Sequence, residues 1–533
     1  MKDEVLNKVY AADAAAIPRY RIVNKDGSIV DEGVEIQLMN SVEQEGTMFN
    51  KFNILKDSTA ALYGLTPDAV PDDVFQVIKD EVKAINGIIV VVESTLGSVI
   101  TATLGDTTIT ATAEGSVYTL KLPRYGVWSI KMVNGDTEKT VSLNVDASKI
   151  YHVTLTLSNV YGVMWRTDLS GTQLTRLTGD NDPNNYVNTS IDTEPVVGVD
   201  TSAGSSPFDD LYPWSKMEEW NVDDSGNVTH KRGDPSFSRS LYDTVVFIPT
   251  FYYKVVDDPS NHKRYFYIAS DPISGFAKHP GSGRCLSRYF YNGALEKSFI
   301  SGKKAHPWVP ATQATNINSK NTSKWFLGDF ATLCAVRLLY LVEFADWNSQ
   351  KTIGVGYWSA SPSYDDYSKE GATDPMTYHT GRVTANNMVQ YRHIENLWFA
   401  QGTFVDWHGA NIYNGEVYVC EDPTKFAFET AENYVNTGIT FSPHSGYITA
   451  LGYSAVAPWA FISVATGGSS STYIPDYVDV PVDTNWRTLA TGYDSNPTGT
   501  EAGLFMEHTN RASSGYCKGL FLPTEEEIAL MSA

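Results

Sequence analysis

The sequence predicts a multidomain, mainly β protein with a small α+β region at its N-terminus and a larger α+β head at its C-terminus. Three observations lead to this prediction. A chain of 533 residues is too long for one hydrophobic core. Seven short strand-like runs follow one another between positions 88 and 157, and the chain beyond them is rich in Tyr, Trp and Gly with one clear helical pattern. We therefore divide the chain into residues 1–86, 87–158 and 159–533.

Residues 1–86 contain a hairpin pattern and a helix pattern. "PRYRIVNKDGSIVDEGVEIQL" (18–38) alternates apolar and polar residues around an Asp-Gly turn. "VPDDVFQVIKDEVKAING" (70–87) has apolar residues at helical spacing, acidic residues near its start and a Gly at its end. The region has too little core to stand alone, so we expect its apolar stripe to pack on a partner or on copies of itself.

Residues 87–158 predict an immunoglobulin-like β-sandwich. The runs "IIVVVE", "SVITATL", "TTITATA", "SVYTLKL", "GVWSIKMV", "KTVSLNV" and "IYHVTLTL" are short and evenly spaced, and Gly, Asp or Pro stands at most of the joints. Apolar residues alternate with polar ones within them, as at Trp128, Ile130 and Met132. This period-2 pattern on seven short strands is typical of a sandwich, which we expect to act as a spacer.

Residues 159–533 predict a loop-rich head around one helix. In "LGDFATLCAVRLLYLVEFADWNSQ", Asp329 is placed to cap a helix. A 3.6-residue period follows in Phe330, Leu333, Cys334, Arg337, Leu338, Leu341, Val342 and Ala345. Long loops, such as 169–240 and 360–390, separate short strands, and long ordered loops on a compact frame tend to carry function.

The net charge and the lack of a targeting signal limit the kinds of partner and the cellular compartment that we expect. The chain has 62 acidic and 40 basic residues, a formal net charge of −22, which repels phosphate backbones and anionic lipid. We therefore expect no nucleic-acid partner and no membrane insertion. No signal peptide and no run of 18 apolar residues is present, so we expect folding in a cytoplasm and exit by lysis or as part of a particle.

A search for catalytic and metal motifs finds no convincing one. The four cysteines stand singly, with no metal-ligand spacing. "GDNDPNN" (179–185) and "NVDDSGN" (221–227) resemble calcium loops, but Ile191 and Arg232 stand where each loop needs its bidentate Glu. Nothing in the sequence pairs a histidine with a nucleophile. We therefore expect no enzyme activity, no cofactor and no metal, and interpret both loops as solvated turns.

Several segments of the head carry a resemblance to a known family. They are "LLYLVEFADWNSQ", "YWSASP", "YRHIENLW", "VDWHG" and "SGYITALGYSAVAPWAFISVATGGSSSTYIPDY". In combination they resemble phage tail proteins of the C-type-lectin-like, formylglycine-generating-enzyme-related fold, some of which are variable proteins of diversity-generating retroelements. "NKFNILKDSTAALYGL" and "AVPDDVF" near the N-terminus are similar to prophage tail fibre proteins of Gram-positive bacteria.

The resemblance implies an N-terminal attachment to the particle, a β-sandwich spacer and a C-terminal lectin-like receptor-binding head. The chain also departs from the family. It lacks the closely spaced cysteine pair of the enzymatic relatives, and "EPV" at 194–196 is the nearest match to the sugar-binding calcium motifs, with no WND. The segment "FAQGTFVDW" also replaces the family's GNVWEW-like segment. These departures argue against the enzymatic chemistry and against calcium-dependent sugar binding.

In the variable relatives, a C-terminal segment displays exchangeable side chains from a fixed scaffold. Here the corresponding segment is 485–523, in which short apolar pieces alternate with small, polar and aromatic residues. Most of the polar residues are reachable from Asn codons by adenine changes alone, whereas Met506, Glu507 and Lys518 are not. Either those three are fixed by the template or the protein is an undiversified cousin. The predicted receptor-binding residues are Trp486, Tyr493, Asp494, Asn496, Thr498, His508, Asn510, Arg511, Ser513, Ser514 and Tyr516.

The leading functional hypothesis is a non-enzymatic receptor-binding protein of a phage tail or tail-like particle. Its expected partners are a protein or glycan receptor on the host bacterial surface and, through residues 1–86, tail or baseplate proteins. A homotrimer is expected by analogy with the family. Two alternatives remain open: a glycan-cleaving tailspike, which needs two carboxylates in a cleft, and a purely structural baseplate component.

Overall fold

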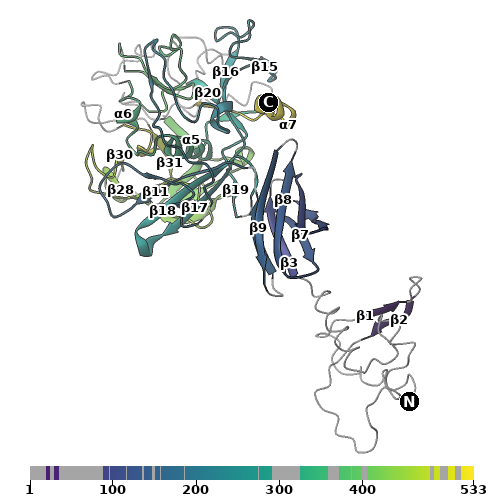
Figure 1. The fold of residues 1–533 in the computed structure, drawn as a ribbon. Coiled ribbons are helices and arrows are strands. Elements are labelled where there is room, and N and C mark those ends of the chain that lie inside the picture. Colours follow the sequence, from purple (N-terminus) through teal and green to yellow (C-terminus); the bar gives the residue numbers. More distant parts are fainter. Residues whose placement is uncertain are drawn as a thin grey trace, which may run out of the picture.

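The fold is described here from a computed structural model. The described residues are 20–23, 29–34, 88–94, 97–115, 117–134, 137–146, 150–155, 158–184, 186–273, 275–290, 324–357, 371–385, 387–398, 405–480, 485–491, 502–510 and 518–533. These residues are mainly β and form seven sheets, which confirms the mainly β prediction at this level (Figure 1). None of their helices is long and apolar enough to span a membrane.

The N-terminal region contributes one pair of strands. Strand β1 (Tyr20–Val23) pairs antiparallel with β2 (Ile29–Val34), which confirms the hairpin pairing predicted from the alternation around Asp26 and Gly27. The helix predicted over residues 70–87 lies outside the described residues.

Residues 88–155 form two four-stranded sheets that share one core. The first sheet has the order β10 (Ile150–Leu155), β3 (Ile88–Ser94), β7 (Val117–Leu122), β6 (Thr112–Glu114). The second has the order β5 (Thr107–Thr110), β4 (Val99–Leu104), β8 (Gly126–Asn134), β9 (Thr137–Val145). All seven predicted runs form strands. The run "TTITATA" is divided at Ala111, and its two halves join different sheets.

The core of this sandwich follows the predicted alternation. On β8 the buried residues are Trp128, Ile130 and Met132, and the residues between them are partly exposed. They pack in one cluster with Val90 of β3 and Leu120 of β7 from the opposite sheet. Because successive side chains of a strand point to opposite faces, each sheet presents one apolar face to this core.

Residues 158–533 form four further sheets. The five-stranded sheet has the order β12 (Thr175–Arg176), β11 (Val160–Arg166), β18 (Lys263–Ala269), β17 (Tyr252–Asp258), β19 (Ala277–Lys278). The four-stranded sheet has the order β13 (Gly198–Val199), β22 (Gly381–Arg382), β23 (Val389–Tyr391), β24 (Ile394–Glu395). The six-stranded sheet has the order β15 (Val228–Lys231), β14 (Glu219–Val222), β16 (Asp243–Ile248), β20 (Arg284–Phe290), β33 (Lys518–Phe521), β21 (Trp325–Leu327).

The largest sheet of the head has eight strands. Their order is β27 (Val435–Thr440), β26 (Glu416–Val419), β25 (Val405–Tyr413), β31 (Arg487–Thr491), β32 (Glu507–Asn510), β30 (Ile474–Asp479), β28 (Gly446–Leu451), β29 (Ser463–Thr466). Short helices lie at Trp214–Lys216, Pro259–Asn261, Ser349–Thr352 and Pro423–Lys425.

Helix α5 (Phe330–Phe344) is the centre of the head. It begins where predicted, because the Asp329 side chain caps it by accepting a hydrogen bond from the Thr332 N–H. All 15 of its residues are buried, a burial wider than the predicted stripe. The helix contacts strands of three different sheets, β11, β16 and β25, so it has no solvent face to leave polar.

The C-terminal end of the chain is built into the head. Strand β33 pairs antiparallel with both β20 and β21, so it is an inner strand of the six-stranded sheet. It is followed by helix α7 (Glu525–Ser532), which has a reciprocal capping box between Thr524 and Glu527. The last strand is therefore held on both edges by segments about 200 residues earlier in the chain.

Candidate functional site

The predicted receptor-binding segment is bracketed by inner strands of two sheets. Its first described part, β31, pairs with β25 on one edge and with β32 on the other. Strand β32 also pairs in parallel with β30, and β33 closes the segment in the six-stranded sheet. The segment is thus attached to the scaffold at three points along its length.

Five apolar residues of the segment form a buried frame. Leu489, Leu504, Phe505, Leu520 and Phe521 are each at most 1% exposed. Leu489, Leu504 and Phe505 belong to the main core of the head, together with α5. Because these side chains are fully packed, the stretches of chain that carry them are fixed in place.

A buried ion pair holds the second attachment point. Arg337 of α5 and Glu507 of β32 are almost completely buried, with 3.1 Å between Arg337 Nη1 and Glu507 Oε1. Arg337 also donates to the carbonyl oxygens of Leu504 at 2.9 Å and Met506 at 3.1 Å. Glu507 in turn accepts from the N–H and hydroxyl of Ser463, at 2.8 and 2.6 Å. The pair is fully hydrogen-bonded, which a buried pair requires.

Asp476 of β30 fixes the same stretch of chain. Its Oδ2 accepts a hydrogen bond from the Phe505 N–H at 2.7 Å. Burial raises the pKa of Asp476 to about 7. Gly503 approaches so closely that a Cβ built on it would lie 2.0 Å from Asp476 Oδ1. Only glycine fits there without displacement of the carboxylate or the chain.

The residues that adenine changes cannot produce are all structural. Met506, Glu507 and Lys518 are each at most 1% exposed. The Lys518 ammonium donates to the carbonyl oxygens of Arg288 at 3.0 Å and Glu395 at 2.8 Å. Their side chains are therefore parts of the scaffold.

The exposure predicted for His508 is wrong. This side chain is only 5% exposed, and its Nδ1 lies 3.4 Å from Oδ2 of Asp479 on the neighbouring strand β30. The neighbouring imidazole of His508 holds the pKa of Asp479 below its usual range. Successive residues 502–509 are all buried, so both faces of the sheet are covered here, and the alternation of polar and apolar residues carries no information about exposure.

Trp486 lies in a surface cluster of aromatic residues that the sequence did not reveal. Its ring stacks on Tyr413 with 4.7 Å between the centroids and 26° between the planes. Tyr418 lies 5.7 Å from Trp486 at 53°. Tyr413 is 43% exposed, and the other two rings are half-buried. We call Tyr413, Tyr418 and Trp486 the aromatic cluster. Its members are up to 73 positions apart in sequence, and strand pairing brings them together.

The other predicted binding residues receive no placement of their side chains. Asn510 ends β32, where its backbone pairs with Thr488. The remaining ones lie outside the described residues: Tyr493, Asp494, Asn496, Thr498, Arg511, Ser513, Ser514 and Tyr516. Of the predicted set, the structure therefore places Trp486 at the surface and His508 in the interior.

The two calcium-like loops are turns in which aspartate oxygens accept hydrogen bonds from the chain. Asp182 is buried and accepts from the N–H groups of Asn184, Tyr186 and Val187. Asp223 accepts from the N–H groups of two residues of its own turn at 2.9 Å. No group of three or more His, Cys, Asp or Glu side chains is placed to hold a metal ion in the part of the chain that the structure describes.

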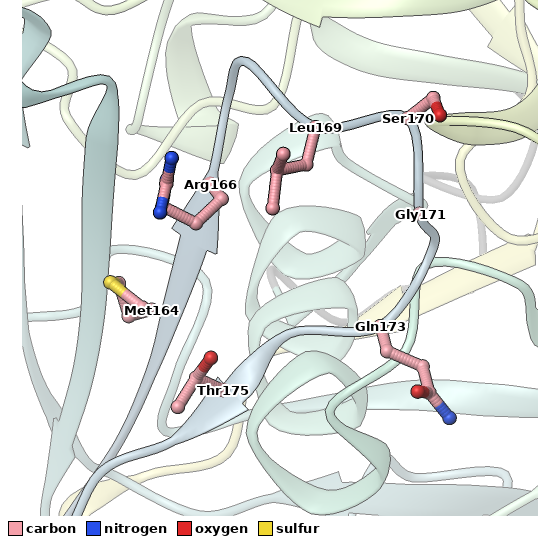
Figure 2. A pocket seen from close by; sticks show the side chains of 7 residues that line it. All are labelled: Met164, Arg166, Leu169, Ser170, Gly171, Gln173 and Thr175. Carbon is pink, nitrogen blue, oxygen red and sulfur yellow. The ribbon is translucent and has the colours of Figure 1, made fainter.

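One pocket of about 340 Å³ lies beside β11, and its lining does not suit catalysis. Figure 2 shows its side chains on β11, on the returning β12 and on the turn between them. Arg166 in its wall is already paired with Asp168 at 2.7 Å. The other lining residues are Met164, Leu169, Ser170, Gly171, Gln173 and Thr175, which supply no nucleophile paired with a base.

No family model matches the chain, and no curated protein matches it.

Proposed function

We propose that the chain is a non-enzymatic receptor-binding protein of a phage tail or tail-like particle. In this proposal residues 1–86 attach it to the particle, the sandwich of residues 87–158 is an immunoglobulin-like spacer, and residues 159–533 form a C-type-lectin-like head. Segment 485–523 presents the receptor-binding side chains, and several copies, as in a homotrimer, add avidity.

The observation that supports this proposal is that the described part of segment 485–523 combines a buried frame with an aromatic residue, Trp486, at the surface. The frame is anchored by the Arg337–Glu507 pair and by Asp476, whereas Trp486 lies in the exposed aromatic cluster. A rigid frame reduces the conformational entropy lost on docking. Tyr and Trp add a large contact area with few rotatable bonds, as in antibody paratopes.

The tailspike alternative has weaker support in the described residues. It requires two carboxylates in a cleft, one of them protonated to act as the general acid. A pocket of about 310 Å³ is lined by Glu194 and Asp346. Each of these carboxylates is paired with a cation, Glu194 with Arg176 at 2.7 Å and Asp346 with Lys351 at 3.4 Å. Both carboxylates of this pocket are therefore already engaged in ion pairs.

The test of the proposal is binding of the labelled full chain to a panel of Gram-positive bacteria. We expect binding to some strains, and we expect the triple variant Tyr493→Ala, Arg511→Ala, Tyr516→Ala to lose it with an unchanged Tm. His508 is kept because it is buried. A triple variant that adsorbs like the parent chain would contradict this location of the site. Release of reducing sugar ends from the cell walls would favour the tailspike.

A matched control variant carries three alanine substitutions at exposed apolar or aromatic positions elsewhere in the head. Leu241, Tyr453 and Val456 are 70%, 40% and 60% exposed. We expect this variant to bind cells like the parent chain. A second test removes residues 1–86, which should leave a folded fragment that binds cells but no longer joins particles. An insoluble fragment would show that the boundary at residue 86 is misplaced.

A further inference from the structure

The register of three neighbouring strands places Glu416 and Asn436 beside the aromatic cluster, and we call these two residues its polar edge. On β26 the side chains of Val417 and Val419 are buried, so Glu416 and Tyr418 point to the opposite, outer face. Directly paired residues share a face, and Glu416 is paired with Tyr413 of β25. In the same way Tyr418 is paired with Asn436 of β27. Three strands therefore bring two aromatic rings, a carboxylate and an amide to one surface, where Trp486 adds a third ring.

The polar edge retains hydrogen-bonding capacity. The Tyr418 hydroxyl donates to Glu416 Oε2 at 2.6 Å, and Asn436 Nδ2 donates to the same oxygen at 3.4 Å. The Oε1 atom of Glu416 accepts no hydrogen bond from the residues that the structure describes. Glu416 and Asn436 are both exposed. The two hydrogen bonds to Oε2 hold the carboxylate group in position. The Oε1 atom is therefore a preorganised acceptor for ligand hydroxyl groups.

We propose that the aromatic cluster and its polar edge bind a neutral sugar ring of a host-surface glycan, an inference that rests on the proposed function. A pyranose presents a face of C–H groups that packs on an aromatic ring, and hydroxyl groups at its rim that donate to a carboxylate. The surface offers both partners side by side: the ring of Tyr413, a residue that is 43% exposed and stacked on Trp486, and the Oε1 atom of Glu416.

Charge and ring geometry select this ligand over two others. The carboxylate of Glu416, on a chain of net charge −22, disfavours phosphate-bearing or acidic ligands. A quaternary ammonium group also suits aromatic rings and a carboxylate, but typical recognition sites for it are cages of several rings. Tyr413 and Trp486 instead stack on each other at 4.7 Å, which leaves no space for a cation between them and presents a flat outer ring.

The test uses the full chain on an array of neutral oligosaccharides built from glucose, galactose, rhamnose, N-acetylglucosamine and N-acetylgalactosamine. The strongest binder is then titrated by calorimetry. We expect Tyr413→Ala and Trp486→Ala each to weaken binding at least about 10-fold, and Glu416→Gln to weaken it several-fold. Tyr453→Ala is the matched control, since this exposed tyrosine of the head, 40% exposed, lies outside the cluster, and it should bind like the parent chain.

Parallel assays separate failure of this inference from failure of the proposed function. Binding to Gram-positive cells without binding to any arrayed sugar would overturn the sugar assignment and leave the receptor-binding function standing. Sugar binding that survives both aromatic substitutions, or that choline competes away, would also overturn it. A shift of Tyr413→Ala to a smaller oligomer, with sugar binding intact, would show that the cluster contacts a second copy of the chain instead. Absence of both cell and sugar binding would refute the proposed function itself.

Discussion

The substitution Arg337→Met tests the claim that a buried ion pair holds the frame of the predicted binding segment. It leaves the Glu507 carboxylate buried, at 1% exposure, without its charged partner. It also removes the donors to the carbonyl oxygens of Leu504, Met506 and Phe461. Removal of one member of a buried ion pair costs about 3–5 kcal/mol. We expect a loss of this size in the free energy of unfolding of the head.

The assay is urea unfolding of the full chain, followed by near-ultraviolet circular dichroism. Glu507 keeps its hydrogen bonds from Ser463, so the loss should stay within this range and leave a folded protein. The double variant Arg337→Met, Glu507→Gln removes the uncompensated charge, and we expect it to be more stable than Arg337→Met alone. A loss below about 1 kcal/mol in the single variant, or full additivity in the double variant, would refute the reasoning.

Three further predictions concern the same scaffold. Gly503→Ala should cost about 1–3 kcal/mol of stability, because its Cβ meets Asp476 Oδ1; Gly171→Ala, with nothing within 4 Å of its Cβ, should be nearly neutral in the same urea titration. Asp476 holds a proton in the folded state up to its pKa of about 7, whereas the unfolded chain releases it near pH 4, so its contribution to stability falls as pH rises through this window. Asp476→Asn should flatten that dependence in unfolding midpoints measured from pH 5 to 8, and an unchanged slope would contradict the raised pKa. Asp329→Ala removes the cap of α5, which should lower stability by about 0.5–2 kcal/mol, and it also removes the ion pair between Asp329 and Arg284. A neutral effect on Tm would contradict the capping role.

Local patterns were reliable where one rule of periodicity applied along the whole element. The alternation of Trp128, Ile130 and Met132 predicted β8 because one face of that strand is buried and the other is not. The Asp329 cap predicted the start of α5 because capping depends on residues within one turn. The extent of burial of α5 was missed, since sheets from distant parts of the chain decide it.

The candidate site also had parts that local patterns could predict and parts that they could not. Its apolar frame could be predicted, because Leu504 and Phe505 have no favourable place except the core. The burial of His508 could not be predicted, because its partner Asp479 is a residue of another strand. Polar residues in a strand indicate exposure only when one face of the sheet meets solvent.

The sequence by itself determined which segments of the sandwich become strands, where the main helix begins and that Leu504 and Phe505 are buried, since these follow from local periodicity, capping and hydrophobicity. Only the tertiary structure decided that Glu507 lies against Arg337, 170 positions away. It also decided that Tyr413, Tyr418 and Trp486 share one face. The physical reason is that strand order and register in a sheet are set by the packing of the whole head, and a register decides which distant side chains become neighbours.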